Sequence, residues 1–124
     1  MQIVNLDTHL LLFALDDALT AREHDILSSN TWGISCIVLW EIAKLTQLGR
    51  IDTSLDEPKL RSALDTLHIW PIDLQTARTS TQLDFSGDPA DELIAATSVV
   101  QRVPLLTRDR QILQSKMVSF AQQA

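Results

Sequence analysis

The chain has 124 residues, of which 45% are hydrophobic and 21% charged, and this is the composition of one ordinary globular domain, 1–124. Its formal net charge of −6 at pH 7 argues against binding of nucleic acid by general phosphate neutralisation, though not against chemistry on nucleic acid at a metal site. No stretch approaches the roughly 20 apolar residues of a membrane span, and no signal peptide is recognisable. The single cysteine, Cys36, cannot form an internal disulfide, so we expect a cytoplasmic protein without a membrane partner.

Strands alternate with helices along the sequence. The apolar runs at 3–6 and 103–106 lack polar alternation, as strands buried on both faces do. Ser35 is expected to cap a helix that ends just before Gly49, and Pro71 is tolerated in an edge strand. In chain order we predict a strand at 2–6, helices at 8–15 and 20–29, a short strand or turn at 33–35, helices at 35–48 and 56–67, a strand at 69–72, helices at 74–83 and 89–101, a strand at 103–107, a helix at 109–115 and a strand at 117–120. This order predicts an α/β fold with a parallel sheet covered by helices on both faces.

Two acidic residues follow predicted strands. Asp7 comes directly after the first apolar run, and Asp109 comes shortly after 103–107. In parallel sheets, ligands bind beyond the carboxyl ends of the strands, so neighbouring strands would bring these two acids to one edge. Each acid also has an alternative interpretation as the N-cap of the helix that follows it.

Two further acidic residues lie on apolar stripes of predicted helices. Glu41 has Ile37 and Val38 at i−4 and i−3, and Asp91 has Ile94 at i+3. A surface ion pair with the lysine three residues on is the alternative for Glu41. Isolated carboxylates on such stripes are costly, and several together repel one another unless a cation lies between them. Hard cations take oxygen ligands, so we predict a site for Mg²⁺, with Mn²⁺ as a substitute.

Four segments in this order resemble the PIN-domain family, and most closely the VapC-type ribonuclease toxins of bacterial toxin–antitoxin pairs. They are residues 6–12, 34–45, 88–97 and 104–110, so the resemblance runs almost from end to end. It implies a three-layer α/β/α sandwich with a mainly parallel sheet. By the same resemblance, four residues take the positions of the family's catalytic and metal-binding acids: Asp7, Glu41, Asp91 and Asp109.

Four further residues near these acids are candidates for supporting roles, one from the resemblance and three from local chemistry. Thr107 matches the family's small hydroxyl residue beside the last acid, and Asp88 is a supporting residue that we expect to cap the helix at Pro89. Arg108 and Arg110 are candidate phosphate contacts, with exposure to solvent as the alternative. The sequence departs from the family at 86–87, where many relatives carry His-Arg and this chain has Ser-Gly.

The resemblance also implies an activity and partners. The expected reaction is Mg²⁺-dependent hydrolysis of RNA phosphodiester bonds by a metal-activated water, in an unpaired region of a structured RNA. The expected protein partner is a cognate antitoxin, and homodimerisation is common among relatives.

Three other functions remain as alternatives at this point. A non-catalytic binding module would share the fold. A phosphorelay receiver domain would need adjacent acids after the first strand and a lysine ending the last one, and no lysine is so placed. A haloacid-dehalogenase-like phosphatase would need an aspartate where His9 stands. Trp32, Trp40 and Trp70 are candidates for base stacking, although tryptophans in apolar runs more often belong to the core.

Overall fold

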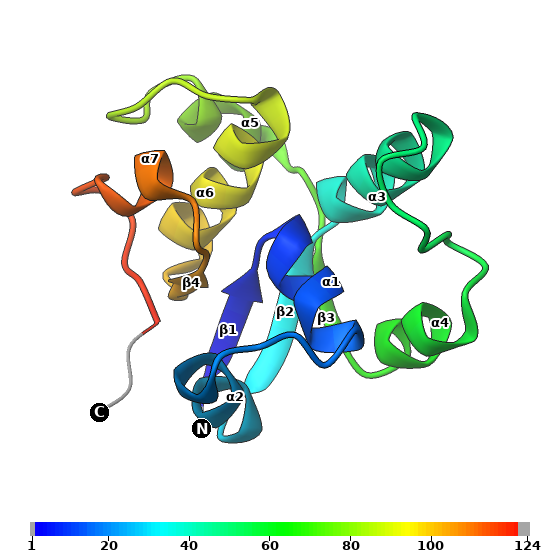
Figure 1. Cartoon of the computed structure of the whole chain (residues 1–124). Coiled ribbons are helices and arrows are strands. Elements are labelled where there is room, and N and C mark those ends of the chain that lie inside the picture. Colours follow the sequence, from blue (N-terminus) through cyan, green and yellow to red (C-terminus); the bar gives the residue numbers. More distant parts are fainter. Residues whose placement is uncertain (1, 122–124) are drawn as a thin grey trace.

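The computed structural model describes residues 2–121, in which a parallel sheet is flanked by helices (Figure 1). In chain order the elements are β1 (Ile3–Leu6), α1 (Thr8–Leu15), α2 (Ala21–Ser28), β2 (Thr31–Ser35), α3 (Ile37–Gln47), α4 (Pro58–Leu64), β3 (His68–Trp70), α5 (Leu74–Ser80), α6 (Pro89–Gln101), β4 (Leu105–Leu106) and α7 (Arg110–Leu113). The strand order is β3-β2-β1-β4, and every neighbouring pair is parallel. The predicted α/β fold is therefore confirmed. Among the described helices, none has the length and apolar character needed to cross a membrane.

The inner strand β1 separates two helical layers. The Asn5 side chain donates hydrogen bonds to the Ile94 carbonyl (3.1 Å) and the Ser98 hydroxyl (3.0 Å), so α6 covers the face to which Asn5 points. Val4 and Leu6 point to the opposite face because side chains alternate along a strand. Both are fully buried, in one apolar cluster with the leucines of α1. The sheet is thus the middle layer of the sandwich.

The three tryptophans differ in how far their side chains are buried. Trp70 is buried, and its indole lies so close to β2 that a Cβ at Gly33 would come within 2.5 Å of it. Trp32 is partly buried and its indole N–H donates to the Leu27 carbonyl (2.8 Å). For Trp40 the expected core position is wrong, because 55% of its surface is exposed. Its apolar neighbours in sequence belong to the buried face of α3, while Trp40 occupies the opposite face.

Helix α3 begins one residue later than predicted and ends where predicted. Ser35 is the last residue of β2, and Cys36 is the N-cap, so the predicted cap is displaced by one residue. The Ser35 hydroxyl still accepts a hydrogen bond from the Ile37 amide at 3.3 Å. The predicted end is confirmed: Gly49 follows the last turn with φ of 71°, a conformation that favours glycine.

Most predicted strands are longer than the observed ones, whereas β2 begins at Thr31, two residues before the predicted start at position 33. Strand β3 ends at Trp70 because Pro71 has no N–H to donate to a ladder. The predicted strand at 117–120 is reduced to an isolated bridge between Leu105 and Phe120, since β4 has only two residues with which to pair. Helix α4 begins at Pro58, which suits the first turn, rather than at position 56.

Candidate functional site

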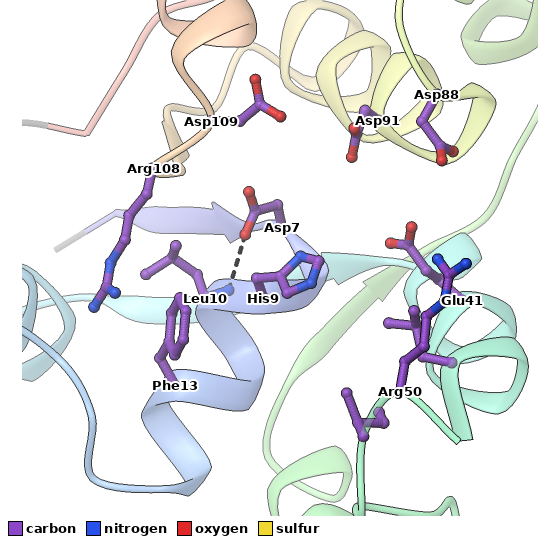
Figure 2. Close-up of a pocket in the computed structure, with 12 residues that line it drawn as sticks. Asp7, His9, Leu10, Phe13, Glu41, Arg50, Asp88, Asp91, Arg108 and Asp109 are labelled. Atoms are coloured by element: carbon purple, nitrogen blue, oxygen red, sulfur yellow. Dashed lines mark hydrogen bonds between the residues drawn. The ribbon is translucent and has the colours of Figure 1, made fainter. Parts of the chain in front are cut away.

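The four acidic side chains singled out in the sequence line one pocket of about 530 Å³. Figure 2 shows that they come from separate elements around it. Asp7 follows β1, Asp109 follows β4, Glu41 lies on α3 and Asp91 lies in the first turn of α6. Asp88 lines the pocket as well. The parallel pairing of β1 with β4 places the ends of these strands, and therefore the residues after them, at one edge of the sheet.

Asp7 is the most buried of these acids, with 6% of its surface exposed. It caps α1, since its Oδ1 accepts a hydrogen bond from the Leu10 amide at 2.9 Å. Its Oδ2 accepts a hydrogen bond from the Thr107 hydroxyl. Burial raises the pKa of Asp7 above its ordinary value, and the hydrogen bonds from Thr107 and Leu10 oppose that rise. Capping and membership of the pocket are therefore two roles of one residue.

The same double role is found at Asp109. Its Oδ1 accepts hydrogen bonds from the Gln111 and Ile112 amides, at 2.9 and 3.1 Å, and so caps α7. Its own amide donates to the Thr107 hydroxyl at 3.0 Å. Thr107 thus connects both strand-end acids.

The pKa of Asp91 departs strongly from that of an ordinary aspartate. Its pKa is raised from 3.8 to about 7, first by burial and then by the negative charges of Glu41, Asp88, Asp109 and Asp7. Repulsion of this kind requires the carboxylates to lie near one another in a poorly hydrated place. The acidic members of the pocket therefore repel one another.

Glu41 is held in place by a residue that the sequence did not single out. The Thr8 hydroxyl donates a hydrogen bond to the Glu41 carboxylate and so joins the start of α1 to α3. Val38 and Ile42, on either side of Glu41 in the helix, are fully buried. Thr8 follows Asp7 directly, and that adjacency to a predicted site residue was the available sequence clue.

The pocket also has basic members. Arg50 and His9 line it, and neither was predicted as a site residue (Figure 2). Arg50 immediately follows Gly49, whose left-handed backbone turns the chain back after α3. No sequence motif marked Arg50, because its approach to the acids depends on this loop path.

The two arginines beside Asp109 are not alike. Arg108 donates to both carboxylate oxygens of Glu23, at 2.7 and 2.8 Å, and to the Ala18 carbonyl at 3.0 Å. Its guanidinium also lies 3.9 Å from the centre of the Phe13 ring. Arg108 lines the pocket, but these bonds commit it to holding the segment before α7 against α1 and α2. Arg110 is exposed and is not among the residues lining the pocket.

The segment that departs from the family, 86–87, has contacts of its own. The Ser86 carbonyl accepts a hydrogen bond from the Gln111 side chain, and the Gly87 amide donates to Glu92 at 3.4 Å. Asp88 then caps α6 through the Ala90 amide at 3.0 Å, as predicted. The loop before α6 is therefore connected to α7 through the Ser86 carbonyl and the Gln111 side chain.

The chemistry of the pocket fits a hard divalent cation, because its acidic members offer only carboxylate oxygens. Their mutual repulsion at Asp91 gives a positive ion a clear electrostatic benefit. The arrangement is open, however: within residues 2–121, no three His, Cys, Asp or Glu side chains are close enough to hold a metal ion between them. Binding would therefore require side-chain rotation or bridging water, which suits Mg²⁺ since it retains several waters.

Comparison with known proteins agrees with this architecture. The model of the PIN domain matches residues 4–116. Among solved structures, VapBC2 from Rickettsia felis, bound to a fragment of its promoter DNA, has a chain that aligns with a TM-score of 0.70 and 19% identity over 95% of this chain and 96% of that one. A chain of a toxin–antitoxin complex from Klebsiella pneumoniae aligns with a TM-score of 0.68 and 22% identity over 98% and 99%.

A third structure, VapBC-5 from Mycobacterium tuberculosis, aligns with a TM-score of 0.65 and 16% identity over 98% of both chains. No curated protein sequence matches the chain. Identities this low show a shared fold, whereas the family match covers most of the sequence. The chain belongs to the PIN domain family.

Proposed function

We propose that the protein is a Mg²⁺-dependent endoribonuclease and the toxin of a toxin–antitoxin pair. The observation that supports this most directly is the convergence of acids from four distant segments on one pocket, where burial, together with the charges of the other acids, raises the pKa of Asp91 to about 7. Membership of the PIN domain family and the fold shared with chains of toxin–antitoxin complexes agree with it.

In this proposal Asp7 and Asp91 are the principal metal ligands. Glu41 and Asp109 complete the set directly or through water, and Glu41 also orients the attacking water. When bound, Mg²⁺ lowers the pKa of a coordinated water and offsets charge on the phosphate. In this proposal the attacking group is water and the protein forms no covalent intermediate. The resemblance to the family implies products with 5′-phosphate and 3′-hydroxyl ends.

The proposed partners follow from the same assignment. A cognate antitoxin would cover the acidic pocket, with a basic side chain as the natural complement to its charge. A structured RNA cut in an unpaired region is the proposed substrate, and a homodimer the proposed assembly. The receiver-domain and phosphatase alternatives are discarded because the chain belongs to another family.

One observation favours a second candidate, a non-catalytic binding module with the same fold. The described carboxylates do not form a ready three-ligand site. Such a module would bind RNA or Mg²⁺ without cleaving any RNA.

Inducible expression in bacteria separates the two candidates. Wild-type protein is compared with Asp7→Asn, and RNA from both cultures is analysed by end-mapping. Growth arrest with discrete cuts only in the wild type is the expected result, because the substitution removes a principal ligand. Equal growth and intact RNA in both cultures, with Mg²⁺ bound by the wild type, would instead assign the binding module.

A further inference from the structure

A second hollow of about 300 Å³ adjoins the acidic pocket. It is lined by His9, Leu12, Phe13, Asp16, Ile51, Asp52 and Thr53. His9, Phe13 and Ile51 line both spaces, so the two are neighbours that share a wall. A polymer lying across the acids would therefore pass directly from one space to the other.

The inner wall of this second hollow is apolar and aromatic. His9 and Phe13 lie one helical turn apart on α1, with ring centres separated by 6.5 Å. Leu12 is buried beneath them, with 6% of its surface exposed. Arg108 covers one face of the Phe13 ring, at 3.9 Å from the ring centre, so the exposed His9 ring is the main stacking surface of this wall. Flat aromatic surfaces of this kind stack with unpaired nucleobases.

The rim of the second hollow carries two carboxylates, Asp16 and Asp52. Both are exposed, and neither side chain has a hydrogen-bond or ion-pair partner within the part of the chain that the structure describes. Carboxylates accept hydrogen bonds and donate none when ionised. The rim therefore offers hydrogen-bond acceptors to a ligand edge that presents N–H groups.

The loop after α3 connects the two spaces. Arg50 lines the acidic pocket, while Asp52 and Thr53 line the second hollow. The loop is anchored on α3, since the Arg50 amide donates to the Leu45 carbonyl at 2.9 Å and the Thr46 hydroxyl donates to the Thr53 carbonyl. A phosphate beside Arg50 would thus have its own base within reach of Asp52.

We propose that this second hollow is a base subsite, in which guanine of the nucleotide next to the cut phosphate stacks on α1 and is read by Asp52, with help from Asp16. Guanine presents two neighbouring N–H donors on its Watson–Crick edge, and one carboxylate accepts both. Adenine and cytosine place a ring acceptor beside their amino group, and uracil flanks its N–H with carbonyls, so each meets repulsion. The inference rests on the proposed ribonuclease function and adds base selectivity to it.

Cleavage of an RNA pool with randomised sequence tests this subsite, with end-mapping of the products. The wild type is expected to prefer cuts next to guanine, and Asp52→Asn to lower the guanine-to-adenine ratio about tenfold, in line with the loss of a two-bond base contact. Asp56→Asn, on the same loop but outside the lining of either space, is the matched control and retains the preference. Cuts by the wild type without preference for guanine, or an unchanged ratio in Asp52→Asn, would overturn the inference while leaving the ribonuclease assignment intact.

A binding measurement separates the two hypotheses. Metal-free protein is titrated with guanosine 5′-monophosphate and with adenosine 5′-monophosphate, and amide shifts are followed by nuclear magnetic resonance. The guanine nucleotide is expected to perturb residues 9–16 and 51–53 in the wild type, and about tenfold more weakly in Asp52→Asn. No perturbation there would reject the subsite. Perturbation in a protein that cuts no RNA would reject the ribonuclease assignment and retain guanine binding.

Discussion

The Thr107 hydroxyl donates a hydrogen bond to the Asp7 carboxylate, although the two residues are 100 positions apart in the chain. The same hydroxyl accepts from the Asp109 amide at 3.0 Å. One small side chain thus holds the ends of β1 and β4 in register and fixes the orientation of both strand-end acids.

Replacing Thr107 with valine removes this link at nearly constant volume. We expect the free energy of unfolding to fall by about 1–3 kcal/mol, because a buried carboxylate loses a donor. The pKa of Asp7 should rise further, since this hydrogen bond lowers it in the wild type. Urea denaturation measures the first effect and carboxyl titration by nuclear magnetic resonance the second. Thr81→Val, which removes an exposed hydroxyl bonded to the Arg78 carbonyl, is the control and should change stability by less than about 0.5 kcal/mol.

The stability of metal-free protein should depend on pH through Asp91. Its pKa is about 7 in the folded chain against an ordinary 3.8, so the folded state binds this proton more tightly than the unfolded state does. The contribution of Asp91 to the free energy of unfolding is then greatest below its ordinary pKa and falls as pH rises toward about 7. Thermal unfolding in a chelator, at a series of pH values, should show a smaller fall for Asp91→Asn than for the wild type. Parallel curves for the two proteins would contradict the electrostatic account of the pocket.

Mg²⁺ should stabilise the wild type, because the proposed site exists only in the folded chain. The melting temperature is expected to rise with Mg²⁺ concentration, and the rise should be largely absent in Asp7→Asn and Asp91→Asn. Asp65→Asn, an exposed residue at the end of α4, is the matched control for loss of one charge. An equal rise in all four proteins would place Mg²⁺ binding elsewhere on the chain.

The pair formed by Arg108 and Glu23 should stabilise the segment that carries Asp109. Glu23 is buried, and Arg108 holds the pKa of its carboxyl below the ordinary 4.5. Glu23→Gln should therefore lower the free energy of unfolding by about 1 kcal/mol at neutral pH, because Arg108 is partly exposed and solvent screens the pair. The difference from the wild type should shrink as pH falls through the folded pKa, because the wild-type carboxyl is then protonated as well. A difference that stays constant with pH would indicate a packing effect instead.

Gly33 should tolerate no larger residue. A Cβ there would lie 2.5 Å from the Trp70 indole, so Gly33→Ala should shift the indole or the strand and destabilise the protein by about 1–3 kcal/mol. Tryptophan fluorescence and urea denaturation report the two effects. Gly87→Ala is the steric control, since the nearest atom to its added Cβ would be 3.6 Å away. Equal stability of both variants would argue against close packing of Trp70 on β2.

Much of the fold was predictable because the apolar pattern is strong in its central elements. The run at Ile3–Leu6 and the stripe of α6 reflect burial that local periodicity records directly. Strand ends were predicted less well, since the length of β4 depends on how many residues of β1 lie close enough to form backbone hydrogen bonds with it. Trp40 was misplaced because an apolar run of one helix includes both its buried and its exposed face.

Residues of the candidate site also differ in how well the sequence predicted them. Asp7 and Asp109 were predictable because an acid after a buried strand is visible in sequence, and Glu41 and Asp91 because a charge on an apolar stripe is costly. Thr8, Arg50 and the Arg108–Glu23 pair were not, since each acts through a contact whose partner lies far along the chain or through the path of a loop.

The sequence alone determined most of the order of strands and helices along the chain, and it singled out the acids that line the pocket. Both predictions were possible because hydrophobic periodicity and the cost of burying charge act on residues close together in the chain. Only the tertiary structure decided which side chains meet across the pocket, that the acids stand too far apart to hold an ion without adjustment, and that Arg108 is bonded to Glu23. Such contacts depend on distances between elements, and those distances are set by packing of the whole chain rather than by any one segment.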